Sequence, residues 1–371
     1  MSVAYFAHEL ADAAVQKRVR MLTLADRQVT LLGFVRDRGA RAPAAPDGAI
    51  VLGRTQNQRL VARALSVLLA LPRALKVKAA WREADLIIAR NLEMLALACV
   101  LARFSGRPRT PIAYECLDIH RLALADGLAG ALVRAVERFL LRRVATIITS
   151  SPAFERNYFR TRQRFTGRIV LAENKVLTAD DVLTPQRAAA APWIIAWCGV
   201  LRCKRSFDLL ADLAANRGVR IELWGLPALD QIADFHDRVA ATPNMSFHGA
   251  YAQTDLPRIY GASHFAWAID FYEAGANSDW LLPNRLYESL CYGAAPIAVA
   301  GVETARWLEE RQVGVVLPEP FAQNLAHFFQ TLTPESYRPL NEATRRLEPE
   351  AIRFTPASCR AFAAQLAGMP A

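Results

Sequence analysis

Cysteine pairs are missing from this chain of 371 residues. Its six cysteines form no CxxC motif and have no histidine partner at the spacing of a metal site. Disulfide-rich secreted domains and zinc-binding domains carry such pairs, so the pattern argues against both. We therefore expect separate buried thiols in a reducing compartment, with the cytoplasm as the default location.

Long apolar segments are also missing. The N-terminus, MSVAYFAHEL, lacks the charged head and apolar run of a secretion signal, and no stretch of about 18 uncharged apolar residues occurs anywhere. These absences predict a protein that is not inserted in a membrane.

Three motifs of nucleotide and metal chemistry are absent. The first expected strand is not followed by GxGxxG, and GxxxxGK with Ser or Thr occurs nowhere, which argues against a dinucleotide dehydrogenase or a P-loop NTPase. No DxD motif stands where it could bind a divalent ion, because the acid pair Asp180–Asp181 lies in an expected linker. We therefore expect no metal cofactor.

Charge is present but unevenly distributed. Residues 1–175 contain 29 Lys and Arg against 14 Asp and Glu, a net charge of +15, whereas the remainder contains 16 against 21, a net of −5. The basic first half indicates a polyanion, a phospholipid surface or a phosphorylated acceptor as its partner. No recognisable nucleic-acid-binding module accompanies this charge, so nucleic acid is the weakest of these options and we expect none.

Short apolar runs alternate with longer helical patterns in both halves of the chain, which predicts parallel α/β sheets. The expected strands of the first half are 3–7, 29–34, 85–90, 111–117, 146–151 and 169–174. Those of the second half are 193–199, 219–225, 245–251, 264–270 and 295–300.

The length allows two domains of about 150 residues each. An Ala- and Pro-rich stretch without a clean period, 178–192, indicates a linker between them. We expect a first domain at 1–177, a second at 193–352 and a C-terminal helix at 353–371.

Three glycines of the second half, Gly199, Gly225 and Gly249, stand at or near the carboxyl ends of expected strands. Glycine is required where a backbone approaches a ligand closely or turns sharply. Each could be an ordinary turn glycine, but three in succession indicate a binding site.

Two cations, Arg202 and Lys204, follow Gly199 and precede a helix that we expect Ser206 to cap. Backbone N–H groups and the helix dipole favour an anion at such a helix start, and the cations add charge-assisted hydrogen bonds. The segment therefore predicts a phosphate site, with solvated surface charge as the alternative.

The stretch 281–299 sets Glu288 inside a helix that we expect to end at Gly293 before an apolar strand. Glycine just past a helix end adopts the left-handed conformation that stops the helix. A carboxylate one turn earlier then faces the region where nucleotides bind in open α/β sheets. The alternative is a surface acid before a routine turn.

Residues 283–288, PNRLYE, with GAAPI at 293–297, resemble the donor-site segment P-x-K-x-x-E…G-x-P-V of GT-B glycosyltransferases of the family-4 type. NSDWLLPNRLYE (277–288) and YECLDIH (114–120) resemble more closely the bacterial exopolysaccharide enzymes that assemble succinoglycan-type repeat units on a lipid carrier. The resemblance implies the GT-B fold, with two Rossmann-like, doubly wound α/β domains facing a central cleft and the last helix crossing back to the first domain.

The resemblance also implies which residues bind the nucleotide-sugar donor. Glu288 would bind the ribose, and the 199–204 loop would bind the diphosphate. The remaining donor-binding candidates are Asn277, Ser278, Asn284 and Arg285. In a metal-independent site, cations such as Arg202, Lys204 and Arg285 would stabilise the leaving diphosphate.

The chain departs from the family-4 pattern at two places. The motif E-x7-E requires Glu eight residues before Glu288, where this chain has Trp280, and Glu273 lies too far upstream. The first loop, AHELADAA at 7–14, lacks the usual Gly-Gly pair. Retaining and inverting stereochemistry both stay open, and the donor phosphate must be bound mostly from the second half.

An inverting reaction needs a base near the acceptor hydroxyl, and YECLDIH places Glu115, Asp118 and His120 at the end of a strand. Strand alternation puts Glu115 on the opposite face from Asp118, so Asp118 is the better base candidate and Glu115 is more suited to bracing the fold. His8, at the end of the first strand, is the second candidate. The alternative is that these side chains cap the next helix or pair with arginines.

The segment 60–81 combines leucine-rich turns with Arg63, Arg73, Lys76, Lys78 and Trp81, and Pro72 should divide it in two. A basic amphipathic stretch with an interfacial Trp suits an anionic membrane surface. The alternative is a core helix with a basic edge.

Together these features predict a metal-independent glycosyltransferase, peripheral on the inner face of the cytoplasmic membrane. Its donor would be a nucleotide-diphosphate sugar and its acceptor a polyprenyl-diphosphate-linked saccharide. Two alternatives stay open: a GT-B enzyme of the nucleotide-sugar epimerase or hydrolase type, and a non-catalytic nucleotide-sugar-binding assembly protein.

Overall fold

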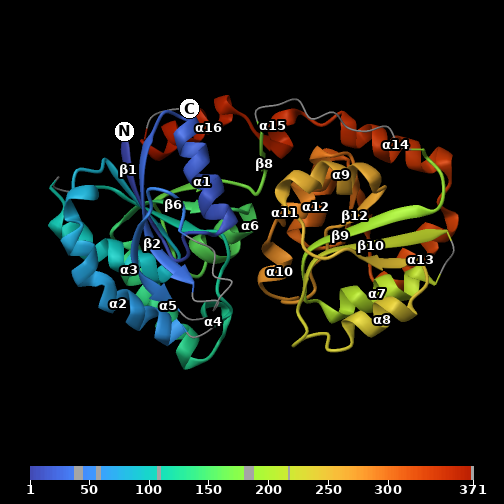
Figure 1. The fold of residues 1–371 in the computed structure, drawn as a ribbon, viewed down its shortest axis with the longest axis horizontal. Helices are drawn as coiled ribbons and strands as arrows, with labels where there is room; N and C mark the ends of the chain where they lie inside the picture. The colour runs from blue at the N-terminus through green and yellow to red at the C-terminus, as the bar shows by residue number, and fades with distance from the viewer. Residues whose placement is uncertain (37–44, 56–59, 107–109, 179–187, 216–217, 369–371) are drawn as a thin grey trace. The chain divides into compact units, whose positions relative to one another are not determined.

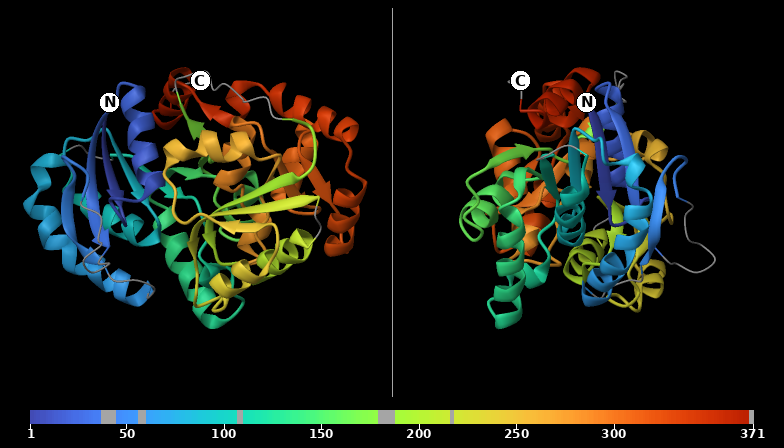
Figure 2. Two further views of the ribbon diagram at one scale, coloured as in Figure 1. Left: turned by 45° about the vertical axis from the view of Figure 1, so that its right-hand side comes forward. Right: turned by 90° about the vertical axis from the view of Figure 1, so that its left-hand side faces the viewer.

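The computed structural model describes the chain except for residues 37–44, 56–59, 107–109, 179–187, 216–217 and 369–371 (Figures 1 and 2). Most of the expected linker at 178–192, with Asp180 and Asp181, lies outside the described residues. The chain divides into two compact units, Met1–Glu173 with Phe354–Ala371, and Asn174–Arg353.

These unit boundaries differ slightly from the expected domains, since 174–177 joins the second unit. The side chain of Asn174 donates a hydrogen bond to the Leu282 carbonyl at 2.8 Å, and Lys175 donates to the Glu350 carbonyl at 2.8 Å. Both bonds connect the segment to the second unit.

The first unit contains a parallel sheet whose strand order is β3-β2-β1-β4-β5-β6-β7. Its strands are β1 (Ser2–Ala7), β2 (Gln28–Arg36), β3 (Ile50–Thr55), β4 (Leu86–Arg90), β5 (Ile112–Cys116), β6 (Val144–Thr149) and β7 (Arg168–Leu171). The sequence analysis did not predict β3. It is a half-exposed edge strand in which Gly53 and Arg54 interrupt the run of apolar residues. The strand order reverses between β1 and β4, which are neighbours in the sheet.

Helices cover this sheet (Figure 1). They are α1 (Ala13–Leu24), α2 (Leu60–Lys76), α3 (Leu92–Leu101), α4 (Arg121–Leu124), α5 (Leu128–Leu141), α6 (Pro152–Phe154), the π-helix η3 (Glu155–Arg160) and α16 (Pro356–Leu366). The C-terminal helix α16 packs against α1, with the Arg18 guanidinium 4.5 Å from the centre of the Phe362 ring. The prediction that the last helix returns to the first domain is confirmed.

Two predictions for the segment 60–81 are wrong. Helix α2 runs through Pro72 without dividing. Trp81 is 1% exposed, donates its indole N–H to the Ala74 carbonyl at 2.9 Å and packs edge-on against Phe6. It anchors the end of this segment in the core and is not available to a membrane interface. Among the described residues, no helix has the length and apolar character to cross a bilayer.

A buried ion cluster on β5 connects the strands of the first unit to α1. Glu115 is fully buried and accepts hydrogen bonds from Tyr5 on β1, from Arg18 on α1 at 2.7 Å and from Arg90 on β4 at 3.3 Å. Burial alone would raise the pKa of Glu115, but the two guanidinium groups and the tyrosine hydroxyl outweigh burial and lower it. Glu115 is therefore an ionised carboxylate that braces the fold.

The second unit contains a parallel sheet with the order β11-β10-β9-β12-β13-β14. Its strands are β9 (Trp193–Leu201), β10 (Val219–Pro227), β11 (Met245–Phe247), β12 (Phe265–Trp267), β13 (Ala295–Val299) and β14 (Val315–Leu317). The short strands β8 (Val176–Leu177) and β15 (Arg353–Phe354) pair separately. Here the order reverses between β9 and β12.

The helices of the second unit are α7 (Lys204–Ala214), α8 (Phe235–Ala241), α9 (Leu256–Ala262), α10 (Asn277–Trp280), α11 (Asn284–Cys291), α12 (Glu303–Arg311), α13 (Phe321–Thr331), α14 (Pro334–Arg345) and α15 (Pro349–Ile352). An aromatic cluster fills the core at the amino ends of the strands. Trp193, Phe265 and Tyr337 meet there with ring centroids 5.1–6.5 Å apart. Tyr337 comes from α14, so this helix closes the core beneath β9 and β12.

Replacing Glu115 by Gln should destabilise the first unit. Arg18 and Arg90 would lose their buried counter-charge, and breaking a buried ion pair costs about 3–5 kcal/mol of unfolding free energy. The loss should show as a lower urea midpoint near neutral pH. The exposed change Glu309→Gln is the control and should leave the midpoint almost unchanged.

The wild type and the Glu115→Gln variant should also differ in how their unfolding free energy depends on pH. Because the folded pKa of Glu115 is lowered, its stabilisation is complete above the unfolded pKa of about 4.3 and is lost as the pH falls through the folded value. The stability gap between the wild type and Glu115→Gln should therefore narrow in acid. A gap that stays constant down to acid unfolding would contradict an ionised Glu115.

Candidate functional site

In the second unit, three neighbouring strands each have a glycine at or near the carboxyl end, as the sequence indicated. Gly225 on β10 pairs in register with Gly199 on β9, and its N–H donates to the Gly249 carbonyl at 2.7 Å. All three have positive φ, at 132°, 120° and 80° respectively. A Cβ atom on Gly225 would stand only 1.8 Å from the Gly199 carbonyl oxygen. Gly225 is therefore a steric requirement, whereas a Cβ on Gly199 or Gly249 would meet no atom within 4 Å, which leaves open space beside their backbone at the carboxyl edge of the sheet.

We call Gly199, Gly225 and Gly249 the glycine row. The two predicted cations lie next to it, at the start of α7. The Arg202 guanidinium lies 3.5 Å from the Asp270 carboxylate and 4.4 Å from the centre of the Tyr272 ring. Lys204 pairs with Asp208 one turn along α7, at 2.9 Å. Arg202 thus reaches the end of β12, across the strand reversal, whereas Lys204 is directed along its own helix.

The predicted cap of α7 is wrong by three residues. The N-cap is Cys203, whose Sγ accepts a hydrogen bond from the Ser206 N–H at 3.4 Å. Ser206 lies in the first helical turn and is fully buried. Ser is a commoner N-cap than Cys, which explains why the sequence pattern pointed to the wrong residue.

Arg285 connects β9 to the end of β12. It occupies the first turn of α11, behind the exposed Asn284, and donates to the Ile269 carbonyl at 2.8 Å. A longer contact of 3.5 Å leads to the Cys198 carbonyl. Its Nε–H is buried and has no hydrogen-bond partner among the described residues. The guanidinium therefore stands at the strand reversal with one donor still unused.

Glu288 is half-buried on α11, one turn after Arg285. Burial raises the pKa of the Cys198 thiol to about 12, and the nearby negative charge of Glu288 adds to the shift. The carboxylate therefore lies close to the carboxyl end of β9. The predicted helix end is confirmed, since Gly293 has φ +83° and the Ala294 N–H donates back to the Ser289 carbonyl at 2.8 Å.

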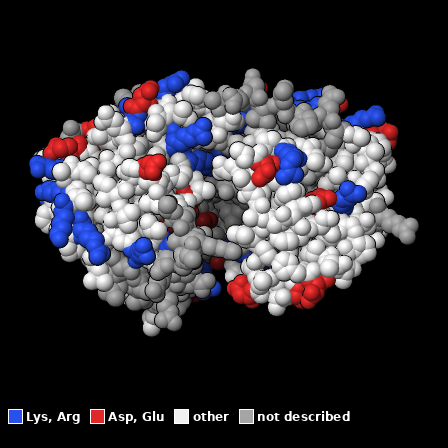
Figure 3. All heavy atoms as spheres, viewed as in Figure 1, with Lys and Arg blue, Asp and Glu red and all other residues white. Residues whose placement is uncertain are grey.

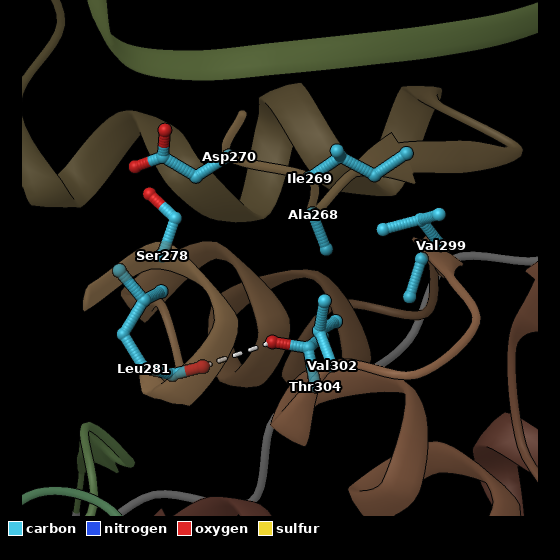
Figure 4. Close-up of a pocket in the computed structure, with 9 residues that line it drawn as sticks. Ala268, Ile269, Asp270, Ser278, Leu281, Val299, Val302 and Thr304 are labelled. Carbon is cyan, nitrogen blue, oxygen red and sulfur yellow. Dashed lines mark hydrogen bonds between the residues drawn. The ribbon is translucent and has the colours of Figure 1, made fainter. Parts of the chain in front are cut away.

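Asn277 and Ser278 are both buried in α10, in the loop that follows β12. The Ser278 hydroxyl accepts a hydrogen bond from the Glu273 N–H at 3.0 Å. Ser278 also lines a small cavity of about 10 Å³ with Asp270, and Figure 4 shows the two side chains pointing toward one another. This volume is about the room for one water molecule. The loop thus presents Asp270 beside Arg202.

Two aromatic residues of this edge were missed by the sequence analysis. Trp224 precedes Gly225 and His248 precedes Gly249, and their rings stack with centroids 4.1 Å apart and planes 14° from parallel. Arg258 lies 5.0 Å from the Trp224 ring centre. An aromatic residue directly before Gly225 and before Gly249 was the available sequence signal, but a pair that far apart in sequence cannot be recognised without the strand order.

The first unit has a cavity of about 230 Å³ at its own strand reversal. Its lining includes His8 after β1, Asn91 after β4, and Asp118 and His120 after β5. The structure thus brings the two proposed base candidates, His8 and Asp118, into one cavity. Glu115 is not among the lining residues, and its position in the ion cluster leaves it no exposed oxygen for a substrate.

Asp118 is exposed at the rim of this cavity, beyond the end of β5. His120 is engaged as the alternative interpretation expected, because its Nδ1 accepts a hydrogen bond from the Leu122 N–H at 3.2 Å and caps α4. Asn91 has φ +72°, a conformation rarely adopted outside glycine, and it occupies the N-cap position of α3 without a side-chain capping hydrogen bond. Strained residues of this kind gather at functional sites. Nothing in the local sequence distinguished Asn91.

A second buried carboxylate, Glu137 on α5, also lines the cavity. It accepts hydrogen bonds from the Tyr114 hydroxyl at 2.9 Å and from Tyr158 and Gln163. Burial raises the pKa of Glu137, although these three donors act in the opposite direction. The sequence analysis missed this residue because its partners come from three separate segments.

Beside the cavity, ligand atoms of His8, Glu9 and Asp12 lie within 4.8 Å of one another. The two acids already have structural partners. Glu9 pairs with Arg36 at 2.8 Å, and Asp12 caps α1 and pairs with Arg90 at 3.3 Å. This grouping is explained by the fold, and a metal-independent reaction remains a prediction.

Comparison with known proteins identifies the family to which this chain belongs. Residues 2–175 match the family model described as a glycosyl transferase 4-like domain. The chain is 42% identical to the succinoglycan biosynthesis protein ExoL of Rhizobium meliloti (strain 1021), over 99% of this chain and 93% of that protein.

Solved structures agree in fold at low identity. Sucrose-phosphate synthase from Thermosynechococcus elongatus has a TM-score of 0.75 at 15% identity, covering 99% of this chain and 98% of that one. Anabaena Alr3699/HepE in complex with UDP-glucose has a TM-score of 0.69 at 16% identity, with both chains covered completely. WaaG, a glycosyltransferase involved in lipopolysaccharide biosynthesis, has 0.66 at 12%, covering 97% and 98%.

The fold and these matches define an enzyme, a glycosyltransferase with two Rossmann-like units of the GT-B type. The glycine row and the two strand reversals are the parts of that fold described above. The chain belongs to the glycosyltransferase family that includes the succinoglycan biosynthesis protein ExoL.

Replacing Gly225 by Ala should disrupt the glycine row. The new Cβ would meet the Gly199 carbonyl at 1.8 Å, so β9 and β10 would have to separate. We expect a loss of about 3 kcal/mol or more in unfolding free energy, the range of severe backbone effects. Gly301→Ala is the matched control, because Gly301 also has positive φ, +88°, but no atom within 4 Å of the added Cβ. It should cost only the conformational strain of about 1–2 kcal/mol. Equal losses in urea unfolding would mean that the close approach of Gly199 is unimportant.

Proposed function

We propose that this enzyme transfers a sugar from a nucleotide-diphosphate sugar to a polyprenyl-diphosphate-linked saccharide during exopolysaccharide biosynthesis. The relative named for succinoglycan biosynthesis supports the pathway class, and HepE in complex with UDP-glucose supports the donor class. The observation that carries the proposal is the strand reversal of the second unit. There the uncovered backbone at Gly199, the cations Arg202 and Arg285, and the carboxylate of Glu288 gather at one sheet edge.

Each of these groups suits one part of the donor. Glu288 would accept hydrogen bonds from the ribose hydroxyls. The glycines would let the diphosphate approach the start of α7, where helix N–H groups favour an anion. Arg202 and the unused Nε–H of Arg285 would stabilise the negative charge that grows on the diphosphate as the sugar–oxygen bond breaks. Asn277, Ser278 and Asn284 would complete the donor site.

The cavity of the first unit is the proposed acceptor site. In an inverting reaction, the exposed Asp118 would take the proton of the acceptor hydroxyl, whose oxygen then bonds to the anomeric carbon while the nucleoside diphosphate leaves with the electron pair. In a retaining reaction, His8 would instead steady the sugar. Trp280 stands where family-4 enzymes carry an acid, so both outcomes stay within the proposal.

A membrane-linked acceptor requires the enzyme to work at a lipid surface, and we place it at the inner face of the cytoplasmic membrane. The net charge of +15 over residues 1–175 supports attraction to anionic lipids. Figure 3 shows Lys and Arg side chains on the first unit, at the left of the face it draws. No nucleic-acid partner and no cofactor beyond the donor are proposed.

Replacing Glu288 by Ala should weaken nucleoside diphosphate binding. A hydrogen bond to a charged acceptor contributes about 1.5–3 kcal/mol, which corresponds to roughly a 10- to 150-fold rise in Kd. Titration calorimetry with UDP, or with whichever nucleoside diphosphate raises the Tm most, measures the change. The exposed Glu309→Ala on α12 is the control. A normal affinity in the folded Glu288 variant would remove the donor site from this position.

Replacing Asp118 by Asn should separate binding from catalysis. The amide keeps the shape but cannot accept the proton of the acceptor, so donor affinity should persist while transfer falls by about 100-fold or more. His8→Ala provides the comparison, and it should be the more damaging change only if the enzyme retains configuration. Near-normal transfer by the Asp118 variant would exclude it as the base, and donor turnover without any acceptor would favour the epimerase or hydrolase alternative.

A further inference from the structure

Helix α5 presents an apolar stripe to solvent. Leu128, Leu132, Val136 and Phe139 are 92%, 67%, 46% and 65% exposed. Their spacing of four, four and three residues places them on one face of the helix. Single exposed apolar residues are ordinary, but a contiguous stripe of this kind marks a contact surface.

The stripe is not the result of a loosely packed helix. On the opposite side, Val133 and Glu137 line the 230 Å³ cavity and Leu141 is buried. At its start, Gly130 packs so closely that a Cβ atom would stand 2.1 Å from the Ala125 carbonyl oxygen. The inner face of α5 therefore forms part of the proposed acceptor site, while the four apolar residues of the outer face are exposed.

Charge around the stripe is almost entirely positive. The segment 121–143 contains five arginines, and its acids are Asp126 and the buried Glu137. Arg142 and Arg143 are exposed at the end of α5, and Arg142 lies 5.9 Å from the centre of the Phe139 ring. An apolar stripe with arginines beside it complements an anionic lipid surface, in which the apolar side chains enter the acyl boundary and the arginines meet phosphate.

We infer that the outer face of α5 inserts into the headgroup region of an anionic bilayer, and that the cavity behind it takes the saccharide of the lipid-linked acceptor. The second part of this inference rests on the proposed function. The membrane contact thereby moves from the segment 60–81, whose Trp81 is in the core, to α5. One helix then contacts both ends of the same acceptor.

A matched pair of substitutions tests the surface. Leu132 on α5 and Leu69 on α2 are equally exposed, at 67% and 66%. Leu132→Gln should lower the partition of the protein onto vesicles of phosphatidylcholine with phosphatidylglycerol by about tenfold, because it removes most of the transfer free energy of one leucine. Leu69→Gln should leave partition nearly unchanged. Co-sedimentation gives both values, with pure phosphatidylcholine vesicles showing the dependence on lipid charge.

Folding and donor binding are checked separately. Both variants should keep the Tm and the UDP affinity of the wild type, since both residues are on the surface and outside the donor site. A larger loss for Leu69→Gln than for Leu132→Gln would overturn the inference in favour of α2. Equal binding by all three proteins would also overturn it.

A protein partner is the remaining outcome. If the wild type forms a dimer in sedimentation velocity without lipid, and Leu132→Gln abolishes it, the stripe is an interface between copies of this chain and the inference fails. Vesicle binding requires neither donor nor acceptor, so it can be tested apart from sugar transfer. A protein that binds vesicles through α5 but transfers no sugar would contradict the proposed function and still support the membrane surface on α5.

Discussion

The site residues of both units depend on one topological constraint, the reversal of strand order within a parallel sheet. Crossovers between parallel strands are right-handed, so a chain that first builds toward one edge and then toward the other must leave two adjacent strands whose connections depart in opposite directions. In the first unit these strands are β1 and β4, and in the second they are β9 and β12. His8 and Asn91 follow the strands of the first reversal, whereas at the second Gly199 lies near the end of β9 and Asp270 follows β12.

The two reversals are built in different ways. The second unit has glycines where side chains would stand: Gly199 approaches Gly225 so closely that Gly225 has no room for a Cβ. Charge is supplied from Arg202 and Arg285, near the starts of α7 and α11. Such an edge suits a ligand with its own negative charge, because the backbone N–H groups and guanidinium groups stay accessible. The first unit retains side chains around a cavity, and the buried Glu115 fixes Arg90 beside it. Directional hydrogen-bonding groups around a cavity suit a neutral, hydroxyl-rich ligand such as a saccharide.

The sequence predicted what depends on local pattern and missed what depends on distant partners. Strand–helix alternation, the glycine row and the end of α11 at Gly293 all follow from spacing along the chain. Short strands such as β14 carry too few residues for a pattern, and α1 is too polar for its apolar face to be recognised. Strand alternation predicted that Glu115 braces the fold, but its partners Arg18 and Tyr5 lie 97 and 110 residues away and could not be named from the sequence. For Trp81, the local pattern predicted a membrane interface and the structure places the residue in the core. The prediction failed because a Trp beside cations has the same local pattern in both environments.

If the proposals above hold, helix α5 would couple acceptor binding to membrane location. From sequence its apolar residues predict core packing on one face, and the two faces can be told apart only when Val133 and Glu137 are seen at the cavity. An α-helix with its side chains is about 10–12 Å across. A saccharide held at the inner face and a lipid surface at the outer face would therefore be separated by about this distance. This geometry would favour acceptors whose growing end lies close to the lipid, because a longer saccharide would carry its terminal hydroxyl past Asp118. The thickness of α5 would then limit acceptor length as well as position the enzyme on the membrane.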